Sequence, residues 1–146
     1  MGLSNAMLLN EQLCFALYST SLAMTKAYKP LLEEIGLTYP QYLAMLVLWE
    51  QDGLTVKELA ARLSQDSGSL TPVLKRLESQ GLISRGRDPR DERNLSLLLT
   101  REGRALRTKG MKVNRAFARA CGLTDEEMST LRQSVARLRE RLSDAA

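Results

Sequence analysis

Three residues, Ser64 to Asp66, are all that separates two helical stretches at about residues 55 to 63 and 67 to 80. A linker of this length is too short for a crossover connection but suits the two helices of a helix-turn-helix motif. The polar segment GRDPRDERN follows between short apolar runs at 82–85 and 95–100, which predicts a β-hairpin with a long tip. The order of these elements predicts a mainly α fold, a winged helix-turn-helix.

Helix start signals recur along the chain. Thr38, Thr55 and Thr124 are each followed three positions later by Gln or Glu, the capping-box pattern in which two side chains satisfy early helix amides. Glycines stand where helices commonly end, at Gly36, Gly53, Gly81 and Gly122. Together these signals predict helices at about 9–35, 39–51, 55–63, 67–80, 101–119 and 124–143.

Positive charge is concentrated in the middle of the chain. Residues 53 to 119 hold 15 Lys and Arg against 7 Asp and Glu, a net charge of +8, whereas the remaining residues hold 6 against 10. A segregated basic region favours a polyanionic partner, although a solvated basic helix face also produces such a count.

The composition argues against an enzyme. There is no histidine, which removes the usual general base and the commonest metal ligand, and two cysteines 107 positions apart do not make a metal site. We therefore expect no catalytic residue, no metal and no cofactor.

No apolar run reaches the roughly 18 residues of a membrane span and no leader pattern opens the chain, so we expect a cytoplasmic protein without a membrane partner. The letters SNAM at residues 4 to 7 are consistent with a cloning remnant, so residues 1 to 7 carry no functional weight.

The second helix of a helix-turn-helix enters the major groove by its N-terminal end. Here that end carries small hydroxyl residues with the right reach for phosphate oxygens and base edges, and the helix amides add partial positive charge. We place Pro72 in the first helical turn, where its missing amide hydrogen costs no bond. We expect Val73, Leu74 and Leu77 to face the core. The candidate DNA contacts are Ser67, Ser69, Thr71, Pro72, Lys75 and Arg76; a polar-capped surface helix is the alternative.

The hairpin segment is rich in arginine. An arginine on a flexible loop can enter a narrow minor groove, where the potential is most negative. Phosphate would repel Asp91, so we expect its carboxylate to orient Arg93 through a charge-assisted hydrogen bond. The candidate contacts of the hairpin are Arg85, Arg87, Asp91 and Arg93, with Arg90 between them.

The segment DSGSLTPVLKRLESQGLISRGRDPRDERNLSLLLTREG resembles the recognition helix and wing of the MarR family of bacterial regulators, whose wings carry an Asp-x-Arg pattern. The resemblance covers nearly the whole chain. It implies a homodimer held by the first and the last two helices, with half-sites about 34 Å apart on a near-palindromic operator in double-stranded DNA. Residues 1–146 are then a single domain, in which 9–35 and 101–143 form a helical dimerisation frame and 39–100 form the winged helix-turn-helix lobe.

All four tyrosines of the chain lie within 28 residues of Cys14. The stretch LCFALYSTSLAMTKAY, followed by GLTYPQYL, resembles the organic-hydroperoxide-resistance repressors of the same family. In that subgroup organic peroxides oxidise a reactive cysteine on the first helix, and two tyrosines hydrogen-bond to it; the matching residues are Cys14, Tyr28 and Tyr39. The resemblance implies a repressor that releases its operator when Cys14 is oxidised.

Helix geometry constrains those roles. Cys14 and Tyr28 are 14 residues apart, about 21 Å along one helix at ~1.5 Å per residue, so they cannot touch within one chain. If Tyr28 donates to the sulfur, it must come from the partner subunit, whereas Tyr18 has the spacing to reach Cys14 locally. Cys121 resembles the resolving cysteine of the two-cysteine repressors. A filler role for Cys121, and a packing role for the tyrosines, stay open.

Other functions are compatible with parts of this pattern. A MarR-type repressor switched by noncovalent binding of a small phenolic or lipophilic ligand would need the same DNA-binding lobe. A thiol peroxidase would need a catalytic cysteine, but the chain has neither a Thr-x-x-Cys nor a Cys-x-x-Cys motif. A structural DNA-binding protein would show little sequence preference and no response to peroxide.

Overall fold

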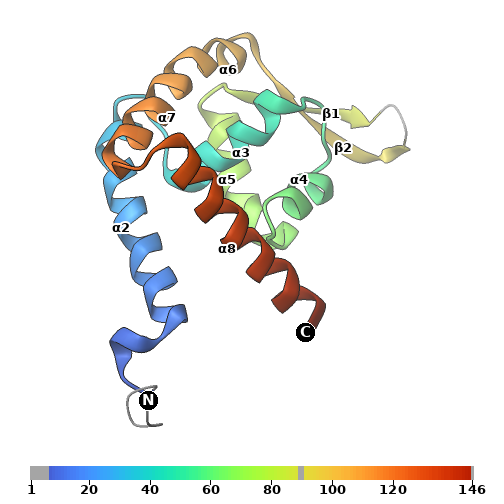
Figure 1. Cartoon of the computed structure of the whole chain (residues 1–146). Coiled ribbons are helices and arrows are strands. Elements are labelled where there is room, and N and C mark those ends of the chain that lie inside the picture. The colour runs from blue at the N-terminus through green and yellow to red at the C-terminus, as the bar shows by residue number, and fades with distance from the viewer. Residues whose placement is uncertain (1–6, 89–90, 146) are drawn as a thin grey trace. The chain divides into compact units, whose positions relative to one another are not determined.

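A computed structural model of the chain describes residues 7–88 and 91–145, without the side chains of residues 88 and 91–94 (Figure 1). The elements, in chain order, are the 3-10 turn η1 (Leu9–Glu11), α2 (Leu13–Glu33), α3 (Tyr39–Glu50), α4 (Val56–Arg62), α5 (Ser67–Ser79), β1 (Ile83–Asp88), β2 (Asp91–Leu99), α6 (Arg101–Ala105), α7 (Arg107–Cys121) and α8 (Asp125–Ala145).

All three predicted capping boxes are present. At the start of α3, Thr38 Oγ1 accepts from the Gln41 amide at 3.4 Å, and Gln41 Oε1 accepts from the Thr38 amide at 2.8 Å. The same exchange opens α4 and α8. The four predicted helix-ending glycines all have positive φ, between 66° and 82°, a region that glycine enters without steric cost.

Two predicted helices differ from the structure in extent. Residues 9–35 are not one helix, because Gln12 is extended and α2 begins only at Leu13. The predicted helix at 101–119 is interrupted at Leu106, and its second part continues to Cys121. Neither Gln12 nor Leu106 is a helix-breaking residue type, so the sequence pattern carried no signal for these breaks.

The hairpin is longer than predicted. β1 and β2 pair antiparallel from Ile83 opposite Leu99 to Asp88 opposite Asp91, with a register shift between Arg87 and Asp88. Most of the segment that we expected to be a loop is therefore strand. Polar and charged residue types are compatible with such a pairing, because the faces of a two-stranded antiparallel ribbon can stay open to solvent.

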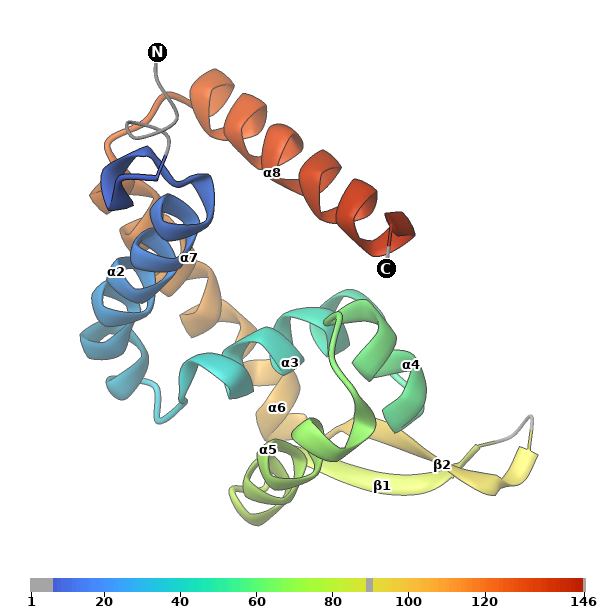
Figure 2. The same ribbon diagram turned by 90° about the horizontal axis from the view of Figure 1, so that it is seen from below.

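A continuous core holds α3, α4 and α5 to the base of the hairpin, and Figure 2 shows the strands extending away from these helices. Burying one aliphatic side chain in this core contributes about 1.5–3 kcal/mol to the free energy of unfolding. This arrangement confirms the predicted winged helix-turn-helix. The buried side chains include Tyr42, Met45, Leu48, Leu59, Leu70, Leu74, Leu77, Ile83 and Leu97.

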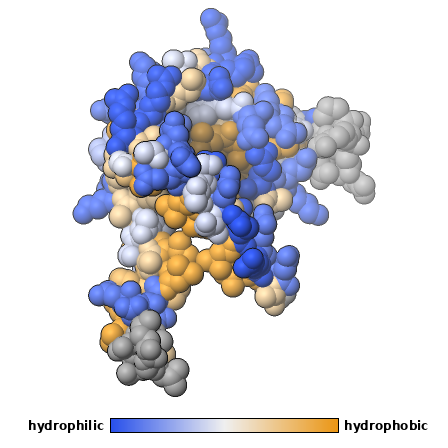
Figure 3. All heavy atoms as spheres, in the orientation of Figure 1, coloured by the Kyte–Doolittle hydropathy of each residue, from blue (hydrophilic) through white to orange (hydrophobic). Residues whose placement is uncertain are grey.

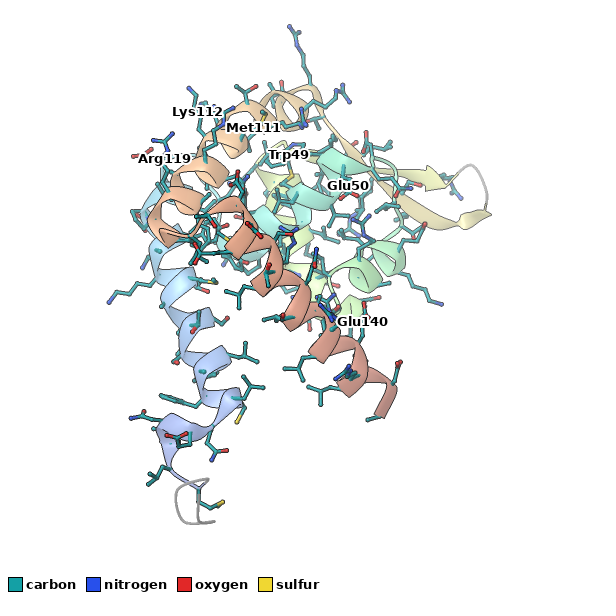
Figure 4. The ribbon with its side chains drawn as sticks, viewed as in Figure 1. Trp49, Glu50, Met111, Lys112, Arg119 and Glu140 are labelled. Carbon is teal, nitrogen blue, oxygen red and sulfur yellow. The ribbon has the colours of Figure 1, made fainter. Side chains whose placement is uncertain are left out.

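Two glycines let α6 and α7 lie close to this lobe. The Trp49 indole Nε1 donates to the Gly103 carbonyl at 2.8 Å, and a Cβ at Gly110 would lie 2.7 Å from the indole ring. A Cβ at Gly103 would overlap the carbonyl oxygen of Leu82. Figure 4 shows Trp49 on α3 beside the part of α7 that carries Met111. This joint fixes α6 and the start of α7 against the lobe.

The chain divides into two compact units, Met1–Val113 and Asn114–Ala146. In the first unit, α2 buries only Tyr28 and Leu32, and its N-terminal part exposes large apolar side chains (Figure 3). In the second unit, α8 buries none of its residues and exposes Leu131, Val135 and Leu142, whose spacing places them on one helix face.

None of the helices in the described part of the chain is both long enough and apolar enough to span a lipid bilayer.

Candidate DNA-binding surface and thiol site

α5 has a capped, polar N-terminal end. Asp66 Oδ1 accepts from the Ser69 amide at 2.8 Å and from Ser69 Oγ at 3.1 Å, and these bonds lower the pKa of the Asp66 carboxyl. Leu70, Leu74 and Leu77 bury one face of the helix, and Val73, which we expected in the core, is half-buried. The six predicted DNA contacts of this helix are all exposed: Ser67, Ser69, Thr71, Pro72, Lys75 and Arg76.

Pro72 lies deeper in α5 than predicted. The helix begins at Ser67, which makes Pro72 its sixth residue, beyond the first turn. Because proline has no amide hydrogen, the Gly68 carbonyl loses its helical donor, and the prediction that Pro72 costs no bond is wrong. Gly68 is exposed, so water can satisfy its carbonyl oxygen.

A groove of about 640 Å³ lies between the exposed face of α5 and the start of β1. Within it, Arg85 Nε donates to the Glu78 carboxylate at 2.9 Å, and the Arg85 side chain is 28% exposed. Arg85 therefore lies on a paired strand, as the apolar run at 82–85 predicted, and the ion pair with Glu78 holds it to α5. The groove is lined by Thr71, Lys75, Glu78, Ser79 and Arg85.

The other hairpin residues predicted to contact DNA lie toward the tip. Arg87 is exposed and pairs with Leu95 across the strands. The side chains of Asp91 and Arg93 lie outside the described residues, as does the whole of Arg90, so the bond expected between Asp91 and Arg93 stays a prediction.

Cys14 lies in the first turn of α2, and its thiol is free and exposed. This position differs from the sequence expectation, which placed Cys14 well inside a longer helix. The first-turn amides of a helix have no intrahelical partner and favour negative charge nearby. Tyr18 follows one turn later and is 64% exposed.

Three tyrosine rings pack together where α2 meets α3. The Tyr28 ring centroid lies 5.1 Å from that of Tyr39 and 5.6 Å from that of Tyr42. Burial raises the pKa of Tyr39; burial, and then the charge on Tyr39, raise the pKa of Tyr42. The Tyr42 side chain is 1% exposed, and its hydroxyl has no hydrogen-bond partner among the described residues. We call these three residues the tyrosine cluster.

The structure thus brings Tyr28 and Tyr39 together, but not with the thiol of the same chain. Cys14 and Tyr28 both lie on α2, so 14 residues, or about 21 Å, separate them along the axis. Tyr42 had no predicted role, although its position three residues after Tyr39 on one helix indicates that the two share a face. Cys121 is the last residue of α7, and it is free and half-buried.

A pocket of about 530 Å³ opens beside the tyrosine cluster, between the second half of α2 and the start of α3. Its lining is mostly apolar, with two lysines and one glutamate. The residues are Leu22, Thr25, Lys26, Lys29, Leu32, Glu33, Leu37, Thr38, Tyr39 and Pro40.

Known proteins resemble this chain in sequence and in fold. The MarR family model matches residues 37–95. The organic hydroperoxide resistance transcriptional regulator of Bacillus subtilis (strain 168) is 46% identical over 136 residues, 93% of this chain and 92% of that protein. The structure of reduced AbfR bound to DNA is 32% identical, with a TM-score of 0.79 over 94% of each chain. Disulfide-formed AbfR is also 32% identical, with a TM-score of 0.66 over 92% of this chain and 95% of that one. AbfR comes from Staphylococcus epidermidis.

Proposed function

The chain belongs to the MarR family of transcriptional regulators, and on this premise we propose that it is a homodimeric repressor that releases its operator when an organic hydroperoxide oxidises Cys14. One observation carries the proposal. The tyrosine cluster is assembled within the chain, but helix α2 holds Cys14 of the same chain about 21 Å away. If the phenols of this cluster act on the sulfur, they therefore have to come from a second copy.

Exposed apolar surface supports the dimer. The N-terminal part of α2 exposes Leu13, Tyr18 and Leu22 at 56–64%, and α8 exposes its own row of apolar side chains. Several large apolar side chains exposed along one helix mark a candidate interaction site. We place the Cys14 segment of one protomer at the partner's pocket beside Tyr39, where the lining is mainly apolar.

Phenols suit the chemistry of the sensing step. The thiolate attacks the distal oxygen of the hydroperoxide, so that an S–O bond forms and the O–O bond breaks. The sulfur is oxidised to sulfenic acid, and the peroxide is reduced to an alkoxide that takes up a proton to become the alcohol. A tyrosine hydroxyl is protonated at neutral pH, and burial raises the pKa of Tyr39 further, so this hydroxyl can donate to the thiolate without adding a buried charge.

Cys121 is the candidate for the second oxidation step. The Cys14 sulfenic acid would condense with the Cys121 thiol of the partner, which forms a disulfide and releases water. Such a bond needs Cα atoms within about 7 Å. Movement that closes a larger gap would change the spacing of the two α5 helices, and operator binding depends on that spacing. The disulfide-formed state of the related AbfR lends support to this step.

Two experiments test the proposal. Mass spectrometry under nonreducing conditions, after less than one equivalent of cumene hydroperoxide, should find Cys14 modified and then joined to Cys121 across subunits. Cys14→Ser should bind the operator with wild-type affinity and keep it after peroxide treatment. Release of DNA by Cys14→Ser at the wild-type peroxide concentration would remove Cys14 from the sensing role.

A second function is favoured by the pocket itself. Its volume of about 530 Å³ falls in the range of small-molecule sites, so a phenolic or lipophilic ligand could be sensed without covalent chemistry. Such a ligand would release DNA equally well from the wild type and from Cys14→Ser. If peroxide releases the operator from the wild type but not from Cys14→Ser, the two functions are therefore separated.

A further inference from the structure

Three hydrogen bonds join the turn before α3 to the end of α5. The Thr38 amide donates to Gln41 Oε1 at 2.8 Å, and Gln41 Nε2 donates to Gln80 Oε1 at 2.7 Å. Gln80 Nε2 then donates to the Gly36 carbonyl at 2.7 Å. We call this chain of bonds the glutamine relay. It connects residues that lie 39 and 44 positions apart in the sequence.

Backbone groups fix the direction of the relay at both ends. The Thr38 amide can only donate, so it must face the oxygen of Gln41, which leaves Gln41 Nε2 to point at Gln80. The Gly36 carbonyl can only accept, so it must face the nitrogen of Gln80, which leaves Gln80 Oε1 to point at Gln41. Neither amide can turn over without placing donor against donor or acceptor against acceptor. The relay is therefore a single arrangement.

The relay begins and ends in the turn beside the tyrosine cluster, and one of its two middle members, Gln80, lies at the end of the recognition helix. Tyr39 lies between Thr38 and Gln41 in the first turn of α3, and Tyr42 follows directly. Gln41 is 3% exposed, so its amide depends on partners inside the protein. Gln80 is the C-terminal cap residue of α5, the helix whose other end carries the predicted DNA contacts.

We propose that Gln80 is a positioning residue for operator release: through Gln41, it makes the orientation of α5 follow the position of the turn that carries Tyr39. This inference rests on the proposed function, which places a partner's Cys14 beside Tyr39, and it adds that oxidation of that thiol displaces Tyr39. Apolar contacts between α3 and α5 also connect the two helices, but such contacts tolerate sliding. The Gln80 side chain, by contrast, is held by two directional bonds, one from the buried Gln41 amide and one to the Gly36 carbonyl, and we expect these bonds to transmit a shift of the turn to α5.

The test is Gln80→Met in the full-length protein, which preserves the length of the side chain and removes both bonds. Gln51→Met is the matched control, because Gln51 caps the C-terminus of α3 as Gln80 caps that of α5, and its side chain is exposed. For each protein, the Cys14 oxidation rate is measured with cumene hydroperoxide by mass spectrometry. The operator Kd is then measured in the reduced and the fully oxidised state.

We expect Gln80→Met to oxidise at a rate within about twofold of the wild type, and the ratio of oxidised to reduced Kd to fall at least tenfold. Gln51→Met should keep the wild-type ratio. Gln80→Glu retains the oxygen that accepts from Gln41 and loses the donor to Gly36, so its ratio should lie between those of Gln80→Met and the wild type. If Gln80→Met unfolds at the working temperature, Gln80→Glu carries the test.

A wild-type ratio in Gln80→Met, or in Gln80→Glu where that variant carries the test, overturns the inference and leaves the proposed function intact. A wild-type protein that is oxidised at Cys14 yet keeps its operator overturns the proposed function, and the inference falls with it. The oxidation rate and the Kd ratio are measured separately, so the two failures are distinguishable.

Discussion

The winged lobe and the N-terminal half of α2 differ in the contacts that each makes within the chain. The lobe buries its own core, caps its own helices and joins its hairpin to α5 through the ion pair between Arg85 and Glu78. Residues 13 to 27 of α2 include none that is buried, and they carry the thiol among exposed apolar side chains. The predicted DNA-binding surface is thus positioned by contacts within one chain, whereas the sensing that we propose depends on contacts with a second chain.

The strongest test of this difference is a charged side chain on the exposed apolar part of α2. Leu22 is 56% exposed and lines the pocket beside Tyr39. In Leu22→Asp, the dimer interface that we propose would have to bury an unpaired carboxylate, so we expect dissociation to monomers. Loss of two-site binding should weaken operator affinity by about 100-fold or more. Sedimentation and operator binding measure the two effects.

Leu46→Asp is the control for that change, since Leu46 is an exposed apolar residue of α3 in the lobe. It should remain a dimer. A Leu22→Asp variant that also remains a dimer would mean that this part of α2 faces solvent in the functional protein.

Within the lobe, the largest loss of stability is expected at Gly103. A Cβ there overlaps the Leu82 carbonyl oxygen, and backbone cannot rotate away as a side chain can. Gly103→Ala should lower the free energy of unfolding by about 3 kcal/mol, measured by urea denaturation. Gly86→Ala is the control: its Cβ would meet the end of the Leu98 side chain at 3.0 Å, which can move, so its loss should be far smaller.

Tyr42→Phe probes the border between the two regions. A buried hydroxyl without a partner reduces stability, so its removal should raise the free energy of unfolding by about 1 kcal/mol. Tyr18→Phe, at a residue 64% exposed, should change stability little. Destabilisation by Tyr42→Phe would instead indicate that the hydroxyl finds a partner in the dimer, and would tie the lobe to the sensing site.

The smallest expected effect is a dependence on alkaline pH. The pKa values of Tyr39 and Tyr42 are raised in the folded chain, which therefore holds these protons more tightly than the unfolded chain does. Their contribution to stability is fully present below the unfolded pKa of about 10 and is lost as the pH rises through the folded values. Urea denaturation at pH 8 to 11 should show the decline, and Tyr39→Phe should reduce it. A flat profile would mean that the two rings are hydrated.

The sequence predicted the elements whose signals are local. A capping box spans four residues and a helix-ending glycine needs only itself, so the helix order and the starts of α3, α4 and α8 were readable. The strand in GRDPRDERN was not, because its pairing with the other side of the hairpin outweighs its turn-forming composition. Helix geometry indicated that Cys14 and Tyr28 are apart, but no local pattern marks Gln80 as the partner of Gln41, 39 positions away.

The joint between α3 and α6–α7 carries a built-in reporter. Trp49 is the chain's single tryptophan, and its indole is wedged between the Gly103 carbonyl and Gly110. Fluorescence excited selectively in tryptophan therefore originates entirely from this contact, without any label. If operator release loosens α7 from the lobe, water entering around the indole should shift the emission to longer wavelengths, and stopped-flow recordings would time that opening against thiol oxidation.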